Sequence, residues 1–186
     1  RIFLHFIYED MYFYDNIITF YTPYFHLMLS LSSFIFHIPR QRPSIHRPMI
    51  YRELQLHNID LSGVILKPNM ILAGTKSKNQ ISNDETAKLT IKCLKETVPN
   101  EVPGIAFLSG GQTEVQATEN LNLINKFNDT NFIMSYSYGR ALQQSALKHW
   151  AKNTEDIKGT QTVFNHRAKM CSLAAKGKWS KELENN

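Results

Sequence analysis

Three short apolar segments, each followed by a helical pattern, constrain the fold of this chain more than any other feature. They are residues 64–67, 104–108 and 132–136. Each is only four or five residues long and gives way to proline, glycine or serine, which is typical of short buried strands. Strands that alternate with helices along a chain pair in parallel within one sheet. The alternation therefore predicts an α/β fold.

The first of these segments ends in a lysine. Val64-Ile65-Leu66 indicates a strand buried on both faces, and Pro68 cannot donate to a sheet ladder, so the strand should stop at Lys67. An amine at the edge of an apolar interior loses hydration, which disfavours its charged form and leaves more of it able to attack a ketone. Lys67 is therefore a candidate Schiff-base nucleophile. The alternative is a lysine that only extends from the strand end into water.

The other two segments end in turns that suit an anion. Residues 104–108 run into Ser109-Gly110-Gly111-Gln112, whose glycines permit close backbone approach and whose consecutive amides can cradle a negative charge. Residues 132–136 run into Ser137-Tyr138-Gly139-Arg140, directly before a helical pattern. A backbone amide, a helix N-terminus and a guanidinium at one point suit a phosphate.

The order of these features is typical of the closing part of a (β/α)8 (TIM) barrel, which binds phosphate in the loops after its last two strands. A complete barrel of this kind needs about 250 residues, whereas this chain has 186. We therefore expect an incomplete barrel, made of the last three strands and their helices.

The region from residue 51 to about residue 178 resembles the C-terminal third of class I fructose-bisphosphate aldolase. The resemblance rests on several motifs in the right order: Leu66-Lys67-Pro68-Asn69-Met70, Thr97-Val98-Pro99, Val102-Pro103-Gly104, Phe107-Leu108-Ser109-Gly110-Gly111-Gln112, Asn120-Leu121-Asn122, Ile124-Asn125-Lys126 and Ser137-Tyr138-Gly139-Arg140-Ala141-Leu142-Gln143.

This resemblance implies a set of site residues. It implies that Lys67 is the Schiff-base lysine. It implies that the substrate phosphate is held by Ser109, Gly110, Gly139 and Arg140, and it makes Ser137 a second-rank candidate near the lysine.

The family also implies the reaction. Fructose 1,6-bisphosphate is cleaved reversibly in glycolysis, in the cytoplasm, to dihydroxyacetone phosphate and glyceraldehyde 3-phosphate. The protonated imine accepts the electrons released by the broken bond, so no metal or other cofactor is expected. The sequence leaves open whether fructose 1,6-bisphosphate or fructose 1-phosphate is preferred.

The family's acids, bases and second lysine come from earlier barrel strands. Residues 179–186 are expected to be a truncated tail, without the family's functional C-terminal tyrosine. We therefore expect this polypeptide to be inactive alone. The family is homotetrameric, but its interfaces need segments that this chain lacks, so the sequence leaves the oligomeric state open. The alternative function is a non-catalytic aldolase remnant, anchored to a membrane or free, that binds a sugar phosphate or a protein partner.

Residues 1–50 do not resemble the family. They contain most of the phenylalanine and no glycine or alanine. Residues 16–39 carry no charge and are long enough to cross a bilayer, but acidic residues and Pro23 argue against a membrane or signal segment. A packed extension specific to this lineage is a second interpretation. We favour a third, translation of sequence outside the true exons, because A- and T-rich codons give this composition. Pro39, Pro43 and Pro48 mark the boundary.

The charge and the cysteines exclude several classes of function. The formal charge of +5 comes from lysines scattered over helices, and no nucleic-acid motif is present, so no nucleic-acid partner is expected. Cys93 and Cys171 lie beside apolar residues in helical patterns and are expected to be core thiols rather than a disulfide or a metal site.

Four helical patterns follow the strands, after the end of an earlier helix over residues 51–59. Ser82 with Glu85 and Thr113 with Gln116 have capping-box spacing. The fourth helix is expected to begin near Thr154. The apolar stripes are expected to pack in the core: Ala87, Ile91, Leu94 and Val98; Ala117, Leu121 and Ile124; Leu142, Ala146 and Trp150; and Ile157, Gln161, Phe164, Ala168 and Cys171.

Overall fold

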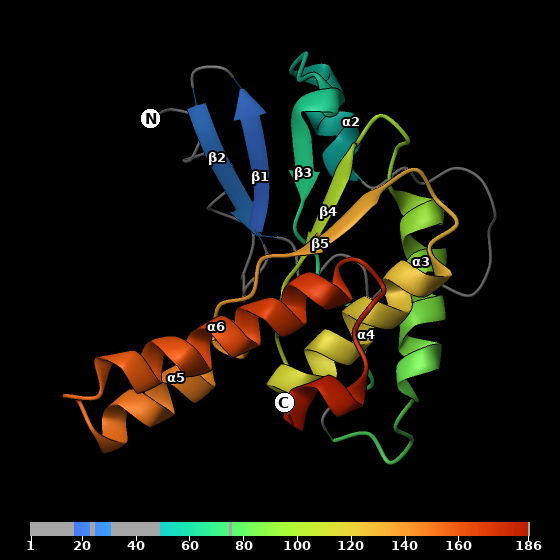
Figure 1. The fold of residues 1–186 in the computed structure, drawn as a ribbon. Helices are drawn as coiled ribbons and strands as arrows, with labels where there is room; N and C mark the ends of the chain where they lie inside the picture. Colours follow the sequence, from blue (N-terminus) through green and yellow to red (C-terminus); the bar gives the residue numbers. More distant parts are fainter. Residues whose placement is uncertain (1–16, 23–24, 31–48, 75, 186) are drawn as a thin grey trace.

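The described strands form one five-stranded sheet in the order β2-β1-β3-β4-β5 (Figure 1). The structure is a computed structural model that describes residues 17–22, 25–30, 49–74 and 76–185. The strands are β1 (Ile17–Thr22), β2 (Phe25–Ser30), β3 (Val64–Leu66), β4 (Gly104–Phe107) and β5 (Ile133–Tyr136). β3 pairs in parallel with β4, and β4 with β5.

These three parallel strands are the ones that the sequence predicts, and they alternate with helices, so the α/β prediction is confirmed. The register aligns Leu66 with Ile105, and Ile105 with Met134. Within the described residues the parallel strands do not close into a barrel, because β5 forms one end of the strand order.

An antiparallel hairpin from the N-terminal segment extends the sheet on the other side of β3. β1 pairs with β2 and also with β3, where Thr19 lies opposite Ile65 and Phe20 opposite Val64. Residues 1–16, 23–24 and 31–48 lie outside the described residues, so the interpretations of residues 1–50 rest partly outside the structure. No helix in the described part of the chain is long and apolar enough to cross a membrane.

The described helices begin within two residues of the predicted positions, with one exception, although the first helix ends at Leu56 rather than at residue 59. They are α2 (Met49–Leu56), α3 (Asn83–Thr97), α4 (Glu114–Phe127), α5 (Arg140–Lys152) and α6 (Ile157–Ala174), with short 3-10 turns η1 (Leu61–Gly63) and η2 (Lys181–Asn185). Ser82 caps α3 by accepting from the Glu85 amide, and Thr113 caps α4 by accepting from the Gln116 amide.

The exception is α6, which begins at Ile157 rather than near Thr154. The Asp156 carboxylate accepts hydrogen bonds from the Gly159 amide (2.9 Å) and contacts the His149 ring (2.9 Å). A side chain at residue 159 would collide with Asp156 and His149. The cap therefore lies where a carboxylate, a glycine and the end of α5 meet.

One face of the parallel sheet carries the core. Val64, Leu66, Ile105, Phe107 and Met134 are buried and pack with the apolar faces of α3 and α4. The intervening residues of the same strands are half-buried or exposed, and Ile133 is 73% exposed. The prediction that the lysine strand is buried on both faces is therefore wrong, because the described helices cover only one side of the sheet.

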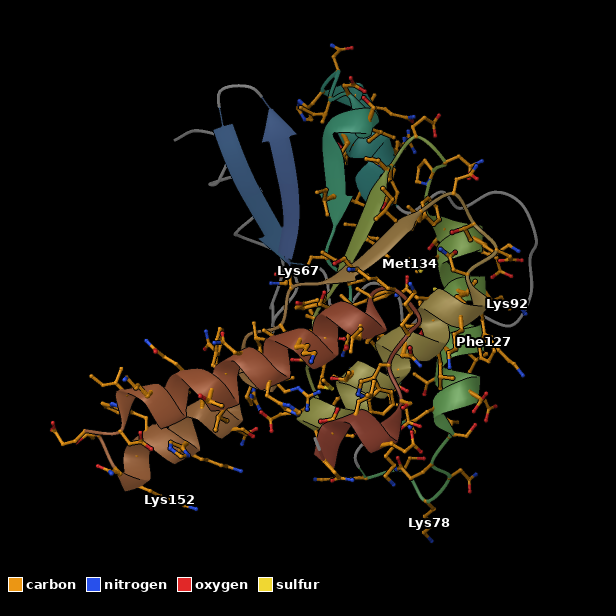
Figure 2. All side chains as sticks on the ribbon, viewed as in Figure 1. Lys67, Lys78, Lys92, Phe127, Met134 and Lys152 are labelled. Atoms are coloured by element: carbon orange, nitrogen blue, oxygen red, sulfur yellow. The ribbon has the colours of Figure 1, made fainter. Side chains whose placement is uncertain are left out.

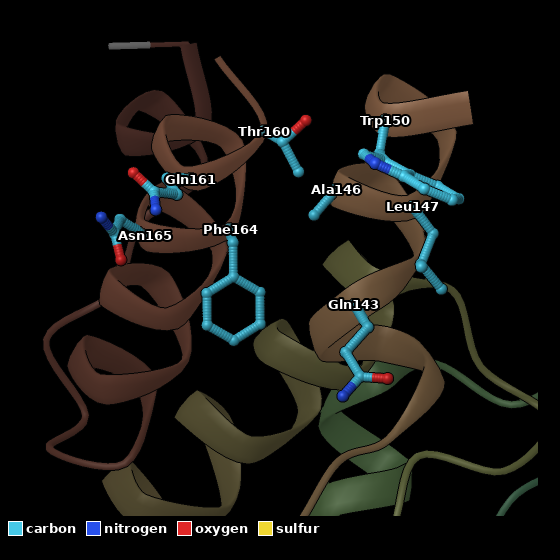
Figure 3. Close-up of a pocket in the computed structure, with 8 residues that line it drawn as sticks. All are labelled: Gln143, Ala146, Leu147, Trp150, Thr160, Gln161, Phe164 and Asn165. Carbon is cyan, nitrogen blue, oxygen red and sulfur yellow. The ribbon is translucent and has the colours of Figure 1, made fainter. Parts of the chain in front are cut away.

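The apolar stripes of α5 and α6 are only partly core, which corrects a second prediction. Ala146 and Cys171 are buried, but Trp150, Ile157 and Phe164 are exposed. The outer parts of these helices pack on each other, and a cavity of about 590 Å³ that is open to solvent lies between them (Figure 3). It is lined by Gln143, Ala146, Leu147, Trp150, Thr160, Gln161, Phe164 and Asn165.

The C-terminal segment packs on α4 and α6. Trp179 is 4% exposed, and its amide donates to the side chain of Asn122 (3.0 Å). The Glu184 carboxylate accepts hydrogen bonds from the two terminal nitrogens of the Arg167 guanidinium (2.9 and 2.7 Å) and from the Trp179 indole N–H (2.7 Å). Residues 179–185, most of the segment 179–186 that was predicted to be a truncated tail, thus supply the carboxylate that pairs with the buried Arg167.

Removing the charge of Glu184 should destabilise the protein. Glu184→Gln leaves the Arg167 guanidinium buried without its anion, which typically costs about 3 kcal/mol. The loss is measured by urea unfolding at pH 7. Glu182→Gln, which changes an exposed carboxylate in the same turn, should leave the midpoint unchanged. Equal midpoints for both variants would contradict the prediction.

The same ion pair makes the stability of the fold depend on pH. Burial alone would raise the pKa of Glu184, but the hydrogen bonds from Arg167 and Trp179 lower it below its ordinary value. The folded pKa therefore lies below the unfolded value of about 4.3. The stabilisation is present above about pH 4.3 and is lost as the pH falls through the folded pKa.

Candidate active site at the carboxyl ends of the parallel strands

The three predicted site segments are joined by backbone hydrogen bonds that continue the sheet past its strands. The Leu108 amide donates to the Pro68 carbonyl (3.0 Å), and the Ser137 amide donates to the Phe107 carbonyl (2.8 Å). The carboxyl ends of β3, β4 and β5 therefore lie side by side. This register brings the residues just after each strand, among them Lys67, Ser109 and Ser137, to one edge of the sheet.

Lys67 continues the alternation of β3. Val64 and Leu66 face the helices, so Ile65 and Lys67 face the opposite side, which the described helices leave uncovered. Lys67 is half-buried, and every other lysine in the described part of the chain is exposed. Figure 2 shows Lys67 just beyond the end of β3.

Burial changes the chemistry of this amine. It lowers the pKa of Lys67, because burial disfavours the charged ammonium form. Among the described residues no carboxylate pairs with Lys67, so no ion pair holds the proton on the amine. A larger neutral fraction makes the amine a better nucleophile at neutral pH.

The Ser109–Gly110–Gly111–Gln112 turn forms as predicted and closes on itself. The Gln112 amide donates to the Ser109 carbonyl (3.2 Å), and Gly111 has φ +78°, which favours glycine. Ser109 is 8% exposed. Because α4 begins at Glu114, the turn lies directly before a helix N-terminus.

Gly139 and Arg140 lie at the start of α5. Gly139 is the N-cap, and its carbonyl accepts from the Leu142 and Gln143 amides (both 3.2 Å). Both residues are exposed, and apart from the adjacent residues no described atom lies within 4 Å of the position that a Cβ would take at Gly139. Within the described residues the Arg140 side chain makes no hydrogen bond or ion pair. The guanidinium is therefore available to an anion.

Contacts that sequence reasoning missed hold these two turns together. The Tyr138 hydroxyl donates to the Ala117 carbonyl in α4 (2.9 Å). The Glu114 carboxylate accepts hydrogen bonds from the amide and the hydroxyl of Ser145 in α5. Nothing in the local sequence pairs these residues, because they come from different βα units. They fix the start of α4 relative to the start of α5.

Among the described residues, neither the cavity between α5 and α6 nor a cluster of metal-binding side chains adds to this site. The cavity between α5 and α6 includes none of the predicted site residues. The residues that the structure describes contain no group of three or more His, Cys, Asp or Glu side chains that could hold a metal ion.

Comparison with known families gives a match over most of the chain. The model of the family described as class-I fructose-bisphosphate aldolase matches residues 46–186. This match extends past both ends of the segment 51–178 that the motifs suggested. It includes the C-terminal turn that packs on α4 and α6.

Curated relatives agree. The chain is 48% identical over 134 residues to a probable fructose-bisphosphate aldolase class 1 of Xylella fastidiosa, covering 70% of this chain and 39% of the relative. It is 41% identical over 133 residues to fructose-bisphosphate aldolase of Dictyostelium discoideum, covering 72% and 37%. It is 45% identical over 130 residues to the cytoplasmic isozyme of Spinacia oleracea, covering 69% and 36%.

A solved structure has the same fold over the matched region. The fructose-bisphosphate aldolase of Plasmodium falciparum, solved in complex with TRAP and a small-molecule inhibitor, superposes with a TM-score of 0.68 at 39% identity. The match covers 70% of this chain and 38% of that one. The chain thus spans about two fifths of the length of the relatives it matches.

Lys67 should react with acylating reagents at a lower pH than an ordinary lysine. Because burial lowers its pKa, the rate of acetylation should reach half its maximum below about pH 10.4, the usual lysine value. Peptide mass spectrometry after brief exposure to acetic anhydride at a series of pH values measures this midpoint. Nα-acetyl-lysine amide in the same tubes is the reference, and a Lys67 midpoint at or above it would refute the prediction.

Proposed function

Because this chain belongs to the class I fructose-bisphosphate aldolase family, we propose that it carries the Schiff-base half of aldolase chemistry, with Lys67 as the nucleophile. The observation that carries the proposal is the position of Lys67. Lys67 is half-buried and lies at the sheet edge where the Ser109–Gln112 turn and the residues leading into α5 also lie.

The proposed reaction is the reversible cleavage of fructose 1,6-bisphosphate. The neutral Lys67 amine attacks the C2 ketone, and loss of water gives a protonated imine. The imine accepts the electron pair when the C3–C4 bond breaks and the C4 hydroxyl loses its proton, which releases glyceraldehyde 3-phosphate. Protonation at C3 and hydrolysis of the imine then release dihydroxyacetone phosphate and restore the amine. This covalent route uses the imine as its electron sink and needs no metal ion.

The phosphate is assigned to the two turns. The amides of Ser109 and Gly110 precede α4, and Gly139 and Arg140 open α5, so backbone donors and one guanidinium can meet one phosphate. Such remote binding orients the ketone against the amine. Ser137 lies between β5 and this pair, at the same edge as Lys67, and is the second-rank candidate for contacting the bound substrate.

The proton-transfer groups are expected in the part of the relatives that the match does not cover. For this polypeptide we therefore propose imine formation, and complete turnover only together with those groups. A cytoplasmic location and a role in glycolysis fit the proposal, since the spinach relative is named a cytoplasmic isozyme. Assembly into the family's homotetramer, like complete turnover, is proposed only together with the segments of the relatives that the match does not cover. Fructose 1,6-bisphosphate is the proposed substrate, and fructose 1-phosphate is the alternative.

Borohydride trapping tests the central step. Incubation with dihydroxyacetone phosphate and reduction should attach the reduced ligand to Lys67, because its amine is the most prone to form an imine. Peptide mass spectrometry locates the adduct. Lys67→Met should abolish it, whereas Lys92→Met, which removes an exposed lysine of α3, should leave it unchanged. An adduct spread over many lysines would exclude the proposed role.

Arg140 should determine how much a phosphate group on the ligand accelerates imine formation at Lys67. The test quantity is the rate of trapping at Lys67 with dihydroxyacetone phosphate divided by the rate with dihydroxyacetone. Arg140→Ala should lower this ratio about tenfold to a hundredfold, the value of a charge-assisted hydrogen bond. Lys152→Ala, at the other end of α5, serves as the control and should leave the ratio unchanged. A ratio in Arg140→Ala equal to that of the unaltered chain would remove Arg140 from the site.

A further inference from the structure

Asn69 connects the lysine segment to the phosphate turn through its side chain. Its Nδ2 donates to the Gly110 carbonyl (3.3 Å), 41 positions further along the chain. Its Oδ1 accepts from the amide of Met70 (2.9 Å), which fixes the orientation of the amide group. Asn69 follows Lys67 by two residues, and Gly110 follows Ser109 directly. One side chain therefore spans the two parts of the proposed site.

The turn is packed against this contact. A Cβ added at Gly110 would lie 3.1 Å from the Leu108 side chain and 3.8 Å from Asn69 Nδ2. The turn is held on its other side as well, because Asn120 of α4, fully buried, donates to the Gln112 side chain (2.7 Å). Asn120 connects the turn to its own helix, whereas Asn69 connects it to the chain segment that follows Lys67.

We propose that Asn69 is a positioning residue, which sets the place of the Ser109–Gly110 turn relative to the Lys67 amine. The inference rests on the proposed function, since it concerns the same site. A phosphate gripped by the turn can orient the ketone only if the turn and the amine keep a fixed separation. The backbone bond from the Leu108 amide to the Pro68 carbonyl sets the strand ends. The Asn69 side chain extends this constraint to the turn itself.

The first test compares a ligand with a phosphate and one without. For the unaltered chain and Asn69→Ala, borohydride trapping at Lys67 is measured with dihydroxyacetone phosphate and with dihydroxyacetone. We expect Asn69→Ala to lower the ratio of the two rates about tenfold, while the rate with dihydroxyacetone stays within about twofold. Asn100→Ala, an exposed asparagine in the turn after Pro99, is the control and should leave both rates unchanged.

Two outcomes of the trapping experiment would overturn the proposal. An unchanged ratio in Asn69→Ala would overturn the proposal. So would an equal fall with both ligands, because a general loss of structure around Lys67 affects the two ligands alike. A positioning residue for the phosphate turn affects only the phosphorylated one.

A second measurement decides the proposal whether or not the chain forms an imine. Hydrogen exchange of a peptide covering residues 108–112 should be faster in Asn69→Ala than in the unaltered chain or in Asn100→Ala. Asn69→Asp is the second variant. It keeps the acceptor for the Met70 amide but loses the donor to Gly110, and it should show the same faster exchange.

Exchange equal to that of the unaltered chain in both Asn69 variants would overturn the proposal. If the unaltered chain traps neither ligand on Lys67, the proposed function fails. The exchange of residues 108–112 still shows in that case whether Asn69 holds the turn.

Discussion

The register of the three parallel strands is the constraint on which the rest of this structure depends. Two backbone hydrogen bonds, Leu108 to Pro68 and Ser137 to Phe107, carry that register beyond the last paired residues. They turn three separate loops into neighbours along one edge. A parallel sheet presents all its carboxyl ends on the same side, so each βα unit contributes its candidate group to the same edge. The candidate amine, backbone amides and guanidinium belong to three different units.

Burial of only one face of the sheet leaves the Lys67 amine half-buried. The helices α3 and α4 cover the face that carries Leu66, Ile105 and Met134, which supplies the apolar burial that holds the sheet. Alternation along β3 then directs the next residue, Lys67, to the other face. The amine is close enough to the sheet to lose hydration and yet accessible enough to react. A lysine one position earlier would lie in the core, where a charged amine has no partner.

Local signals made the three parallel strands and the starts of α3 and α4 predictable, and non-local contacts explain most of what was missed. Proline and glycine mark the strand ends, and the hydroxyls of Ser82 and Thr113 mark the starts of α3 and α4, because each acts within four residues. The exposure of Trp150 was not predictable, since an apolar stripe shows that a helix has a face but not what covers it. The same holds for the pairing of β1 with β3, and for the bond from Asn69 to Gly110 across 41 residues.

Helix α4 connects the candidate site to the C-terminal segment. Near its start, Glu114 and the Ala117 carbonyl accept hydrogen bonds from the α5 unit that carries Arg140. One turn further on, the hydroxyl of Thr118 accepts from Arg167, and Asn122 accepts from the Trp179 amide. Arg167 is held in turn by Glu184. The segment that was predicted to be a truncated tail therefore packs on the same helix that contacts the start of the α5 unit.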